Sequence, residues 1–172
     1  INSYGPDRQR PAFYVIDPLT YFENQFEKIT ENLKSAGIDP DSVTFWKGTT
    51  QDFLPRERAN GTTFDFIFID GDHRHYPVMI DLQWADMVRP GGFIALHDYD
   101  NSFPGVIWSV EYFLQKNPQF SVFDKAEKLI VLQKNAEQTG PGVTGSDLRG
   151  AKIAQLKFKY ARSLRKRLKF LR

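Results

Sequence analysis

Cysteine is absent from this 172-residue sequence, which excludes disulfides and zinc or iron–sulfur sites with cysteine ligands. No apolar run approaches the roughly 20 residues that a membrane-spanning helix needs, and the first residues lack the pattern of a secretory signal peptide. These absences predict a cytoplasmic protein. The length and the hydrophobic content of 41% are those of one globular domain of ordinary size.

Acidic residues are missing from the end of the chain. None follows Asp147, whereas ten of the 23 basic residues lie between Arg149 and Arg172. Residues 1–148 carry 13 basic and 21 acidic residues, so an acidic body precedes a basic tail. We predict a linker over residues 138–147 and a basic amphipathic helix over 148–172, because apolar residues recur there at helical spacing: Ile153, Leu156, Tyr160, Leu164, Leu168 and Leu171. This helix is expected to pack on its own domain, or to contact an anionic membrane surface or a partner protein.

Strand and helix patterns alternate along residues 12–134. Strands are predicted at 12–16, 43–46, 64–69 and 93–96, helices at 20–36, 76–87 and 106–114, and a closing strand pair at 120–123 and 129–132. Such alternation predicts an α/β fold whose sheet is mostly parallel with an antiparallel last strand. The strand at 64–69 is apolar at nearly every position, which is typical of a central strand covered on both faces.

Polar side chains follow the predicted strands. Ligands of open parallel sheets bind beyond the carboxyl ends of the strands, so these positions hold the candidate functional residues. Strand ends need caps and turns but rarely several acids converging on one edge. The candidates are Asp17, Thr49, Thr50, Asp70, Asp72, His73, His97 and Asp98.

Two segments together resemble a known family. Phe-Asp-Phe-Ile-Phe-Ile-Asp-Gly-Asp-His runs from Phe64 to His73, and Arg-Pro-Gly-Gly-Phe-Ile-Ala-Leu-His-Asp-Tyr-Asp runs from Arg89 to Asp100. They resemble class I S-adenosylmethionine-dependent methyltransferases, most of all the branch that includes macrolide-sugar O-methyltransferases. The resemblance covers residues 12–134 and implies a Rossmann-like methyltransferase domain that ends near residue 137.

The resemblance implies a role for most of the strand ends. Asp17 would take the ribose hydroxyls of S-adenosylmethionine, because a carboxylate can accept two hydrogen bonds from a diol. Thr49 and Thr50 would contact the adenine, and Asp70 and Asp72 would line the same cofactor site. Capping of turns is the structural alternative for these residues.

The resemblance also implies a metal site. Asp70 and Asp98 match the carboxylates that hold a divalent cation in metal-dependent members, where Mg²⁺ or Mn²⁺ would favour the alkoxide form of a bound hydroxyl. His97 stands beside Asp98, where many members carry a second carboxylate, and imidazole shifts the preference from Mg²⁺ toward Mn²⁺, Fe²⁺ or Zn²⁺. The alternative is a hydrogen-bonded cluster that caps the sheet edge.

His73 is the predicted general base, because imidazole can accept a proton near neutral pH. Asp70 and Asp98 complete the predicted catalytic set. A helix-capping histidine is the structural alternative, and His75, two residues further on, is expected to be solvated. Among the nearby aromatic residues, Trp108 is expected to pack in the core.

These observations predict a methyltransferase that methylates a hydroxyl of a sugar or other small metabolite. The glycine-rich loop that holds the methionine part of the cofactor in this family is absent from residues 1–172, so we expect a part before Ile1 to supply it. The alternatives are a non-catalytic docking module that keeps the fold, and a nucleotide-binding doubly wound enzyme. The expected partners are a small hydroxyl acceptor and a second copy of the chain, as a homo-oligomer; nucleic acid is not expected.

Overall fold

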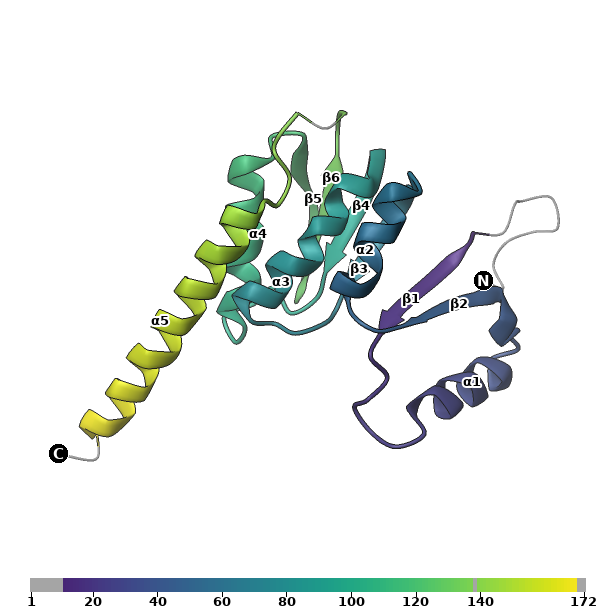
Figure 1. The fold of residues 1–172 in the computed structure, drawn as a ribbon, viewed down its shortest axis with the longest axis horizontal. Helices are drawn as coiled ribbons and strands as arrows, with labels where there is room; N and C mark the ends of the chain where they lie inside the picture. Colours follow the sequence, from purple (N-terminus) through teal and green to yellow (C-terminus); the bar gives the residue numbers. More distant parts are fainter. Residues whose placement is uncertain (1–10, 138, 170–172) are drawn as a thin grey trace. The chain divides into compact units, whose positions relative to one another are not determined.

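A parallel strand pair opens the part of the chain that the computed structural model describes, residues 11–137 and 139–169. The chain divides into two units, residues 1–56 and 57–172 (Figure 1). None of the helices in the described residues is long and apolar enough to cross a membrane.

The first unit holds β1 (Phe13–Asp17), α1 (Gln25–Ser35), the 3₁₀ turn η1 (Pro40–Ser42) and β2 (Val43–Lys47), with β1 and β2 parallel. The two strands pair in register from Phe13 opposite Val43 to Asp17 opposite Lys47. The helix begins at Gln25 and not at the predicted Thr20, because Asn24 has a left-handed backbone (φ 59°) that interrupts the helical run.

Aromatic contacts hold this first unit together. The ring of Trp46 lies 5.0 Å from that of Tyr14 and stacks on Phe53 at 5.5 Å. On the other side of β2, Phe45 meets Phe26 of α1 edge to face. These contacts attach α1 and the start of α2 (Thr50–Ala59) to the strand pair.

A four-stranded mixed sheet forms the centre of the second unit. Its order is β3 (Phe64–Ile69), β4 (Val88–Leu96), β6 (Leu129–Lys134) and β5 (Phe120–Ala126). The first pair is parallel, and both pairs that involve β6 are antiparallel. The predicted α/β architecture with an antiparallel finish is therefore confirmed.

β3 is more exposed to solvent than the sequence pattern predicted. β3 pairs only with β4 among the described strands and so lies at the edge of the four-stranded sheet. Phe66 and Phe68 are 56% and 53% exposed, although the sequence pattern predicted cover on both faces. The apolar pattern identified the strand but not its place in the sheet, because that place depends on which neighbours pair with it.

Two helical segments pack on this sheet and build the core. α3 (His75–Asp81) passes into the 3₁₀ helix η2 (Leu82–Met87), so the single helix predicted over 76–87 changes geometry halfway. The three-residue turn of η2 places Leu82 above Ala85 and Trp84 above Met87, and all four are buried. α4 (Pro104–Lys116) adds Val106, Val110 and Phe113 to the same core.

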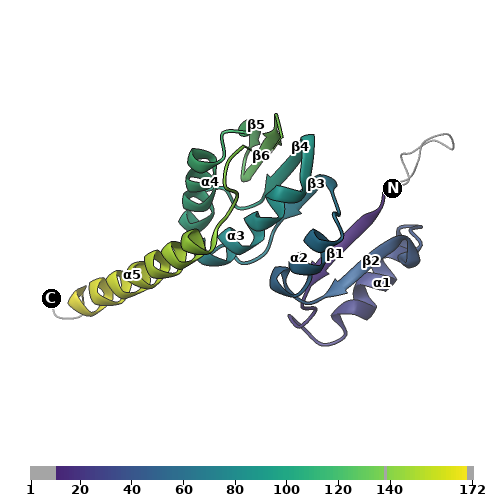
Figure 2. The ribbon, with the colours of Figure 1, turned by 45° about the horizontal axis from the view of Figure 1, so that its top comes forward.

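The C-terminal helix α5 (Gly145–Lys169) belongs to the second unit and packs on α3 (Figures 1 and 2). It begins three residues before the predicted start at Leu148, because Thr144 and Asp147 cap it reciprocally. Residues 170–172, which were predicted to continue the helix, lie outside the described residues. Leu148 and Ala151 face the core, whereas the stripe predicted from Ile153, Leu156 and Tyr160 is exposed.

Candidate active site

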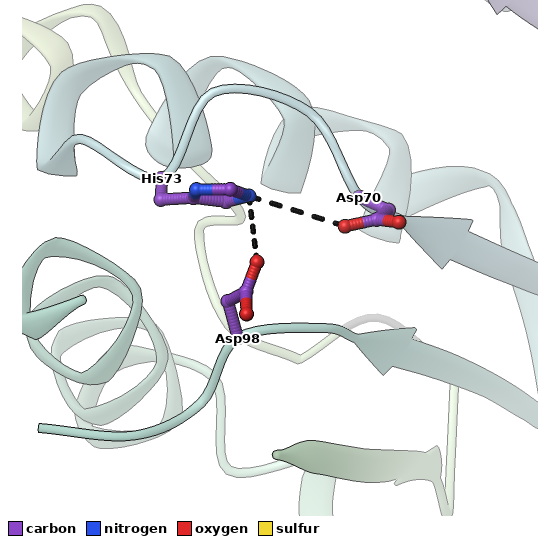
Figure 3. Close-up of side chains that lie close together, drawn as sticks. All are labelled: Asp70, His73 and Asp98. Atoms are coloured by element: carbon purple, nitrogen blue, oxygen red, sulfur yellow. Dashed lines mark ion pairs between the residues drawn. The ribbon is translucent and has the colours of Figure 1, made fainter. Parts of the chain in front are cut away.

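Two adjacent parallel strands bring the predicted catalytic residues together. Asp70 follows β3 and Asp98 follows β4, and the strands are in register from Ile67 opposite Ile94 to Ile69 opposite Leu96. The backbone N–H of His97 donates to the carbonyl of Ile69 at 3.0 Å, which fixes the two strand ends side by side. Parallel strands present their carboxyl ends at one edge, so both carboxylates point into the same space (Figure 3).

His73 reaches this space from the loop between β3 and α3. Its Nε2 atom lies 2.8 Å from Oδ2 of Asp98 and 3.9 Å from Oδ1 of Asp70 (Figure 3). The side chain of Asp98 is only 11% exposed, and the ring of Phe103 packs at 4.5 Å against that of His73. A carboxylate oxygen at 2.8 Å favours the tautomer that carries its proton on Nε2, and in that tautomer Nδ1 is the nitrogen that can accept a proton.

His97 contributes a fourth polar atom to the cluster. Its Nδ1 lies 3.3 Å from Oδ1 of Asp70 and 3.3 Å from Oδ2 of Asp98. This nitrogen is buried, and within the described part of the chain it has no hydrogen-bond partner. A buried polar atom without such a partner is costly unless another group satisfies it.

The donor set fits a divalent cation. Ligand atoms that share one ion at about 2.1 Å lie about 3.4 Å apart in a tetrahedral arrangement, and Nδ1 of His97 lies 3.3 Å from one carboxylate oxygen of Asp70 and 3.3 Å from one of Asp98. The sequence predicted Asp70, His97 and Asp98 as ligands, and the structure brings these three together. His73 also has a ring nitrogen within 4.8 Å of the ligand atoms of Asp70 and Asp98, but a nitrogen that carries a proton toward Asp98 has no lone pair for a cation.

The backbone at Asp98 is itself unusual. Asp98 has φ 58°, the left-handed region that few residues other than glycine adopt and that aspartate tolerates better than most. The turn is held by Asp100, whose N–H donates to the carbonyl of Asp98, and by Tyr99, whose N–H donates to Lys128. This turn ends β4 sharply and fixes Asp98 beside His73.

Comparison with known proteins identifies the family. A family model described as a methyltransferase domain matches residues 5–99, more than half of the chain. The chain belongs to this methyltransferase family. No curated protein matches it.

Solved methyltransferases share the fold. The TDP-rhamnose 3'-O-methyltransferase of calicheamicin biosynthesis aligns with a TM-score of 0.53 and 15% identity, over 70% of this chain and 57% of that one. An O-methyltransferase from Bacillus cereus in complex with SAH gives 0.52 and 19%, over 70% and 62%. TomG from Streptomyces achromogenes, in complex with SAM, gives 0.53 and 17%, over 72% and 61%. The protein thus has the Rossmann-like class I methyltransferase fold, and it spans about three fifths of the length of these proteins.

The residues next to His73 contact each other and α4. Arg74 donates to Asp72 from its backbone N–H, from Nε and from a terminal guanidinium nitrogen. The hydrogen bonds from the Arg74 side chain hold the pKa of Asp72 below its usual range, so Asp72 is ionised and paired. His75 was predicted to be solvated but is half-buried, because its Nδ1 meets Oγ of Ser109 at 2.8 Å, and burial lowers its pKa.

The predicted cofactor residues of the first unit lie at the carboxyl ends of β1 and β2. Oδ1 of Asp17 accepts a hydrogen bond from the N–H of Leu19, which makes a tight turn after β1. Thr49 donates from both N–H and Oγ1 to Asp52 at the start of α2, and Thr50 is buried. These contacts give Asp17 and Thr49 local structural roles, and their part in cofactor binding stays a prediction.

A cavity of about 280 Å³ adjoins His73 on the side of α4 and α5. The site loop and the start of α4 form part of its lining, with Phe103, Pro104 and Gly105 among the lining residues. Trp108 was predicted to pack in the core, and the C-terminal helix was not predicted to contribute to the site. Trp108 and, from α5, Gln155 and Phe158 also line this cavity. No local pattern marks these three residues, because the cavity joins segments about 80 positions apart in the chain.

Proposed function

We propose that this protein transfers a methyl group from S-adenosylmethionine to a hydroxyl oxygen of a sugar or another small metabolite. Membership of the methyltransferase family supports the reaction class. Similarity in fold to a TDP-rhamnose 3'-O-methyltransferase and to further O-methyltransferases supports oxygen as the acceptor atom. The observation that carries the proposal is the 2.8 Å contact between His73 Nε2 and Asp98 Oδ2 at the edge where two parallel strands end.

Bound S-adenosylmethionine supplies a methyl group on a positively charged sulfur. His73 accepts the proton of the acceptor hydroxyl at Nδ1, while the acceptor oxygen forms a bond to the methyl carbon and the carbon–sulfur bond breaks. The products are the methyl ether and S-adenosylhomocysteine. Asp98 orients the ring of His73 through Nε2 and stabilises the imidazolium that forms.

The proposed cofactor residues follow three of the strands. Asp17, Thr49 and Thr50 follow β1 and β2, and Asp70 and Asp72 follow β3. Carboxylates suit the ribose diol, and small polar groups suit the adenine. In this proposal Asp72 keeps its pairing with Arg74, which fixes the loop that carries His73.

Asp70, His97 and Asp98 would hold a divalent cation. When bound there, the ion would favour ionisation of the acceptor hydroxyl. The mixed nitrogen and oxygen donors suit Mn²⁺ better than Mg²⁺. We predict that the protein binds Mn²⁺, measured by electron paramagnetic resonance, and that Asp70→Asn weakens this binding at least about tenfold.

Asp65→Asn is the matched control for the metal site, because Asp65 is an exposed carboxylate on β3 that pairs with Arg89. It should bind Mn²⁺ like the wild type. Equal binding by the wild type and the Asp70→Asn variant would contradict the metal site and leave the His73–Asp98 pair as the proposed proton acceptor.

The reaction is tested with the full-length protein and S-adenosylmethionine labelled in the methyl group. Cofactor binding is measured by calorimetry, and transfer is measured on a panel of glycosides and phenols, with the methylated atom located by NMR. Detection of the labelled methyl group on a former hydroxyl oxygen of an acceptor supports the proposal. Binding of S-adenosylmethionine without transfer to any acceptor favours the non-catalytic module, and binding of NAD in its place favours the nucleotide-binding enzyme.

A further inference from the structure

We infer that α5 forms one wall of the acceptor site, and that this site selects an uncharged hydroxylated ring. The inference rests on the proposed function, because it takes the cavity next to the proposed base as the acceptor site. In this inference the C-terminal helix α5 helps to determine which acceptor binds.

The cavity lies beside the proposed base. His73 and its neighbours Asp72 and Arg74 form one side, and Gln155 and Phe158 of α5 form another. Because His73 lines the cavity, a ring bound there can place a hydroxyl beside the imidazole of the proposed base. A volume of about 280 Å³ is close to the lower end of ligand cavities, at about 300 Å³, and this suits a single ring.

Aromatic side chains supply the walls. Phe158 meets Trp108 edge to face, with ring centroids 5.2 Å apart, and Phe103 packs against His73. Trp108 is 39% exposed and Phe158 45% exposed, so each still offers ring surface to a ligand. Aromatic faces stack on the apolar face of a sugar ring or on a phenol, and a rigid ring loses little conformational freedom on binding.

The charge of the lining argues for an uncharged ligand. Asp72 and Arg74 are the formally charged side chains among the described residues that line the cavity, and they neutralise each other in a multiply hydrogen-bonded pair. A charged ligand would enter an aromatic site without a free counter-ion, and desolvation of that charge would oppose binding. Hydroxyl groups can instead hydrogen-bond to the polar side chains of Ser102 and Gln155.

The α5 wall is fixed to the domain. Oε1 of Gln155 accepts a hydrogen bond from the N–H of Tyr76 at 3.0 Å, and Lys152 lies over the ring of Tyr76. At the start of α5, before these contacts, Asp147 accepts hydrogen bonds from Tyr112 and Lys116 of α4. Phe158 is thus presented to the cavity by a helix anchored at several points.

The test measures binding of single rings to the full-length protein by saturation-transfer NMR. The probes are methyl α-L-rhamnopyranoside and catechol, with methyl β-D-glucuronide and protocatechuate as their carboxylate-bearing counterparts at pH 7. We expect an uncharged probe to bind, the charged counterparts to bind more weakly, and Phe158→Ala to weaken binding about tenfold. Tyr160→Ala, on the exposed side of the same helix, should bind like the wild type. Circular dichroism checks that both variants keep the helix.

The outcomes separate this inference from the proposed function. Binding of the rhamnoside alone or of catechol alone supports the inference and assigns a sugar or a phenolic acceptor. Unchanged binding in Phe158→Ala, or charged probes that bind as well as the uncharged ones, overturns it even if methyl transfer is found. Phe158-dependent binding without methyl transfer to any acceptor contradicts the proposed function and retains the ring site.

Discussion

Gly105 lies where the first turn of α4 crosses the loop that carries His73. A Cβ atom at this position would come within 2.5 Å of the carbonyl oxygen of His73 and 2.6 Å of the backbone nitrogen of His75. Both are backbone atoms of a loop that the site needs in place, so neither can move freely. The absence of a side chain at Gly105 therefore lets α4 approach the site closely.

Gly105→Ala should consequently destabilise the protein by about 1–3 kcal/mol, the usual cost of overpacking. Gly150→Ala is the matched control, because Gly150 is exposed in α5 and a Cβ there meets no atom within 4 Å. That variant should gain about 0.5–1 kcal/mol from helix propensity. Urea unfolding of both variants measures the difference, and equal stabilities would show that α4 does not press on the loop.

Residue types at the site were predictable from sequence, but their partners were not. Asp70, His73 and Asp98 follow strands that the apolar pattern marks clearly, so their meeting at one edge follows from the topology. The pairing of Asp72 with Arg74 and of His75 with Ser109 depends on how the loop and α4 pack. Nothing in the neighbouring sequence encodes that packing.

At the scale of elements, α5 depends on one buried carboxylate. The side chain of Asp147 is 2% exposed and accepts hydrogen bonds from Lys116, Tyr112 and Thr144. Although burial alone raises the pKa of Asp147, the hydrogen bonds from Lys116, Thr144 and Tyr112 together hold it far below its usual range. The ionised carboxylate therefore stabilises the folded state.

Asp147→Asn should cost about 1.5–3 kcal/mol at pH 7, since it removes hydrogen bonds to a charged group. The folded pKa is depressed, so the stabilisation is fully present above the unfolded pKa of about 3.9 and is lost as the pH falls toward the folded pKa. The stability gap between wild type and variant, measured by urea unfolding, should narrow below about pH 4. A gap that is constant from pH 7 to pH 3 would contradict an ionised Asp147.

The elements themselves were largely predictable, and their exceptions have local causes. The β3 pattern, the α4 periodicity and the final hairpin all appear in the structure near their predicted bounds. The left-handed Asn24 delays α1, and the cap formed by Thr144 and Asp147 starts α5 early. The ends of these helices are determined by individual backbone conformations and hydrogen bonds, which the periodicity of apolar residues does not predict.

At the scale of the whole molecule, the buried core belongs almost entirely to the second unit. Ile94 of β4 and Leu132 of β6 are fully buried, whereas neither β1 nor β2 contains a buried residue. Local stability follows buried apolar contacts. Amide hydrogen exchange should therefore be faster in β1 and β2 than in β4 and β6, by at least about tenfold. Equal protection of the four strands would mean that burial within each unit does not set its stability.

Contacts between residues far apart in the sequence could not be predicted, because local sequence patterns do not determine which segments meet. The contact between Gln155 and Tyr76 joins residues 79 positions apart, and the cavity exists only because such contacts form. A helical pattern predicts an amphipathic α5 but does not determine which of its faces meets the domain. The basic tail was therefore predicted as a helix, while its place beside the site came from the structure.

The central claim is that His73, oriented by Asp98, accepts the proton of the acceptor hydroxyl. The most direct measurement is the single-turnover rate of methyl transfer in His73→Gln and Asp98→Asn, with Asp65→Asn as control and cofactor affinity measured in parallel. We expect His73→Gln to lower the rate by about 10²–10⁴-fold, Asp98→Asn to lower it less, and Asp65→Asn to leave it unchanged, all with S-adenosylmethionine binding retained. A His73→Gln variant that transfers methyl groups at the wild-type rate would contradict the claim.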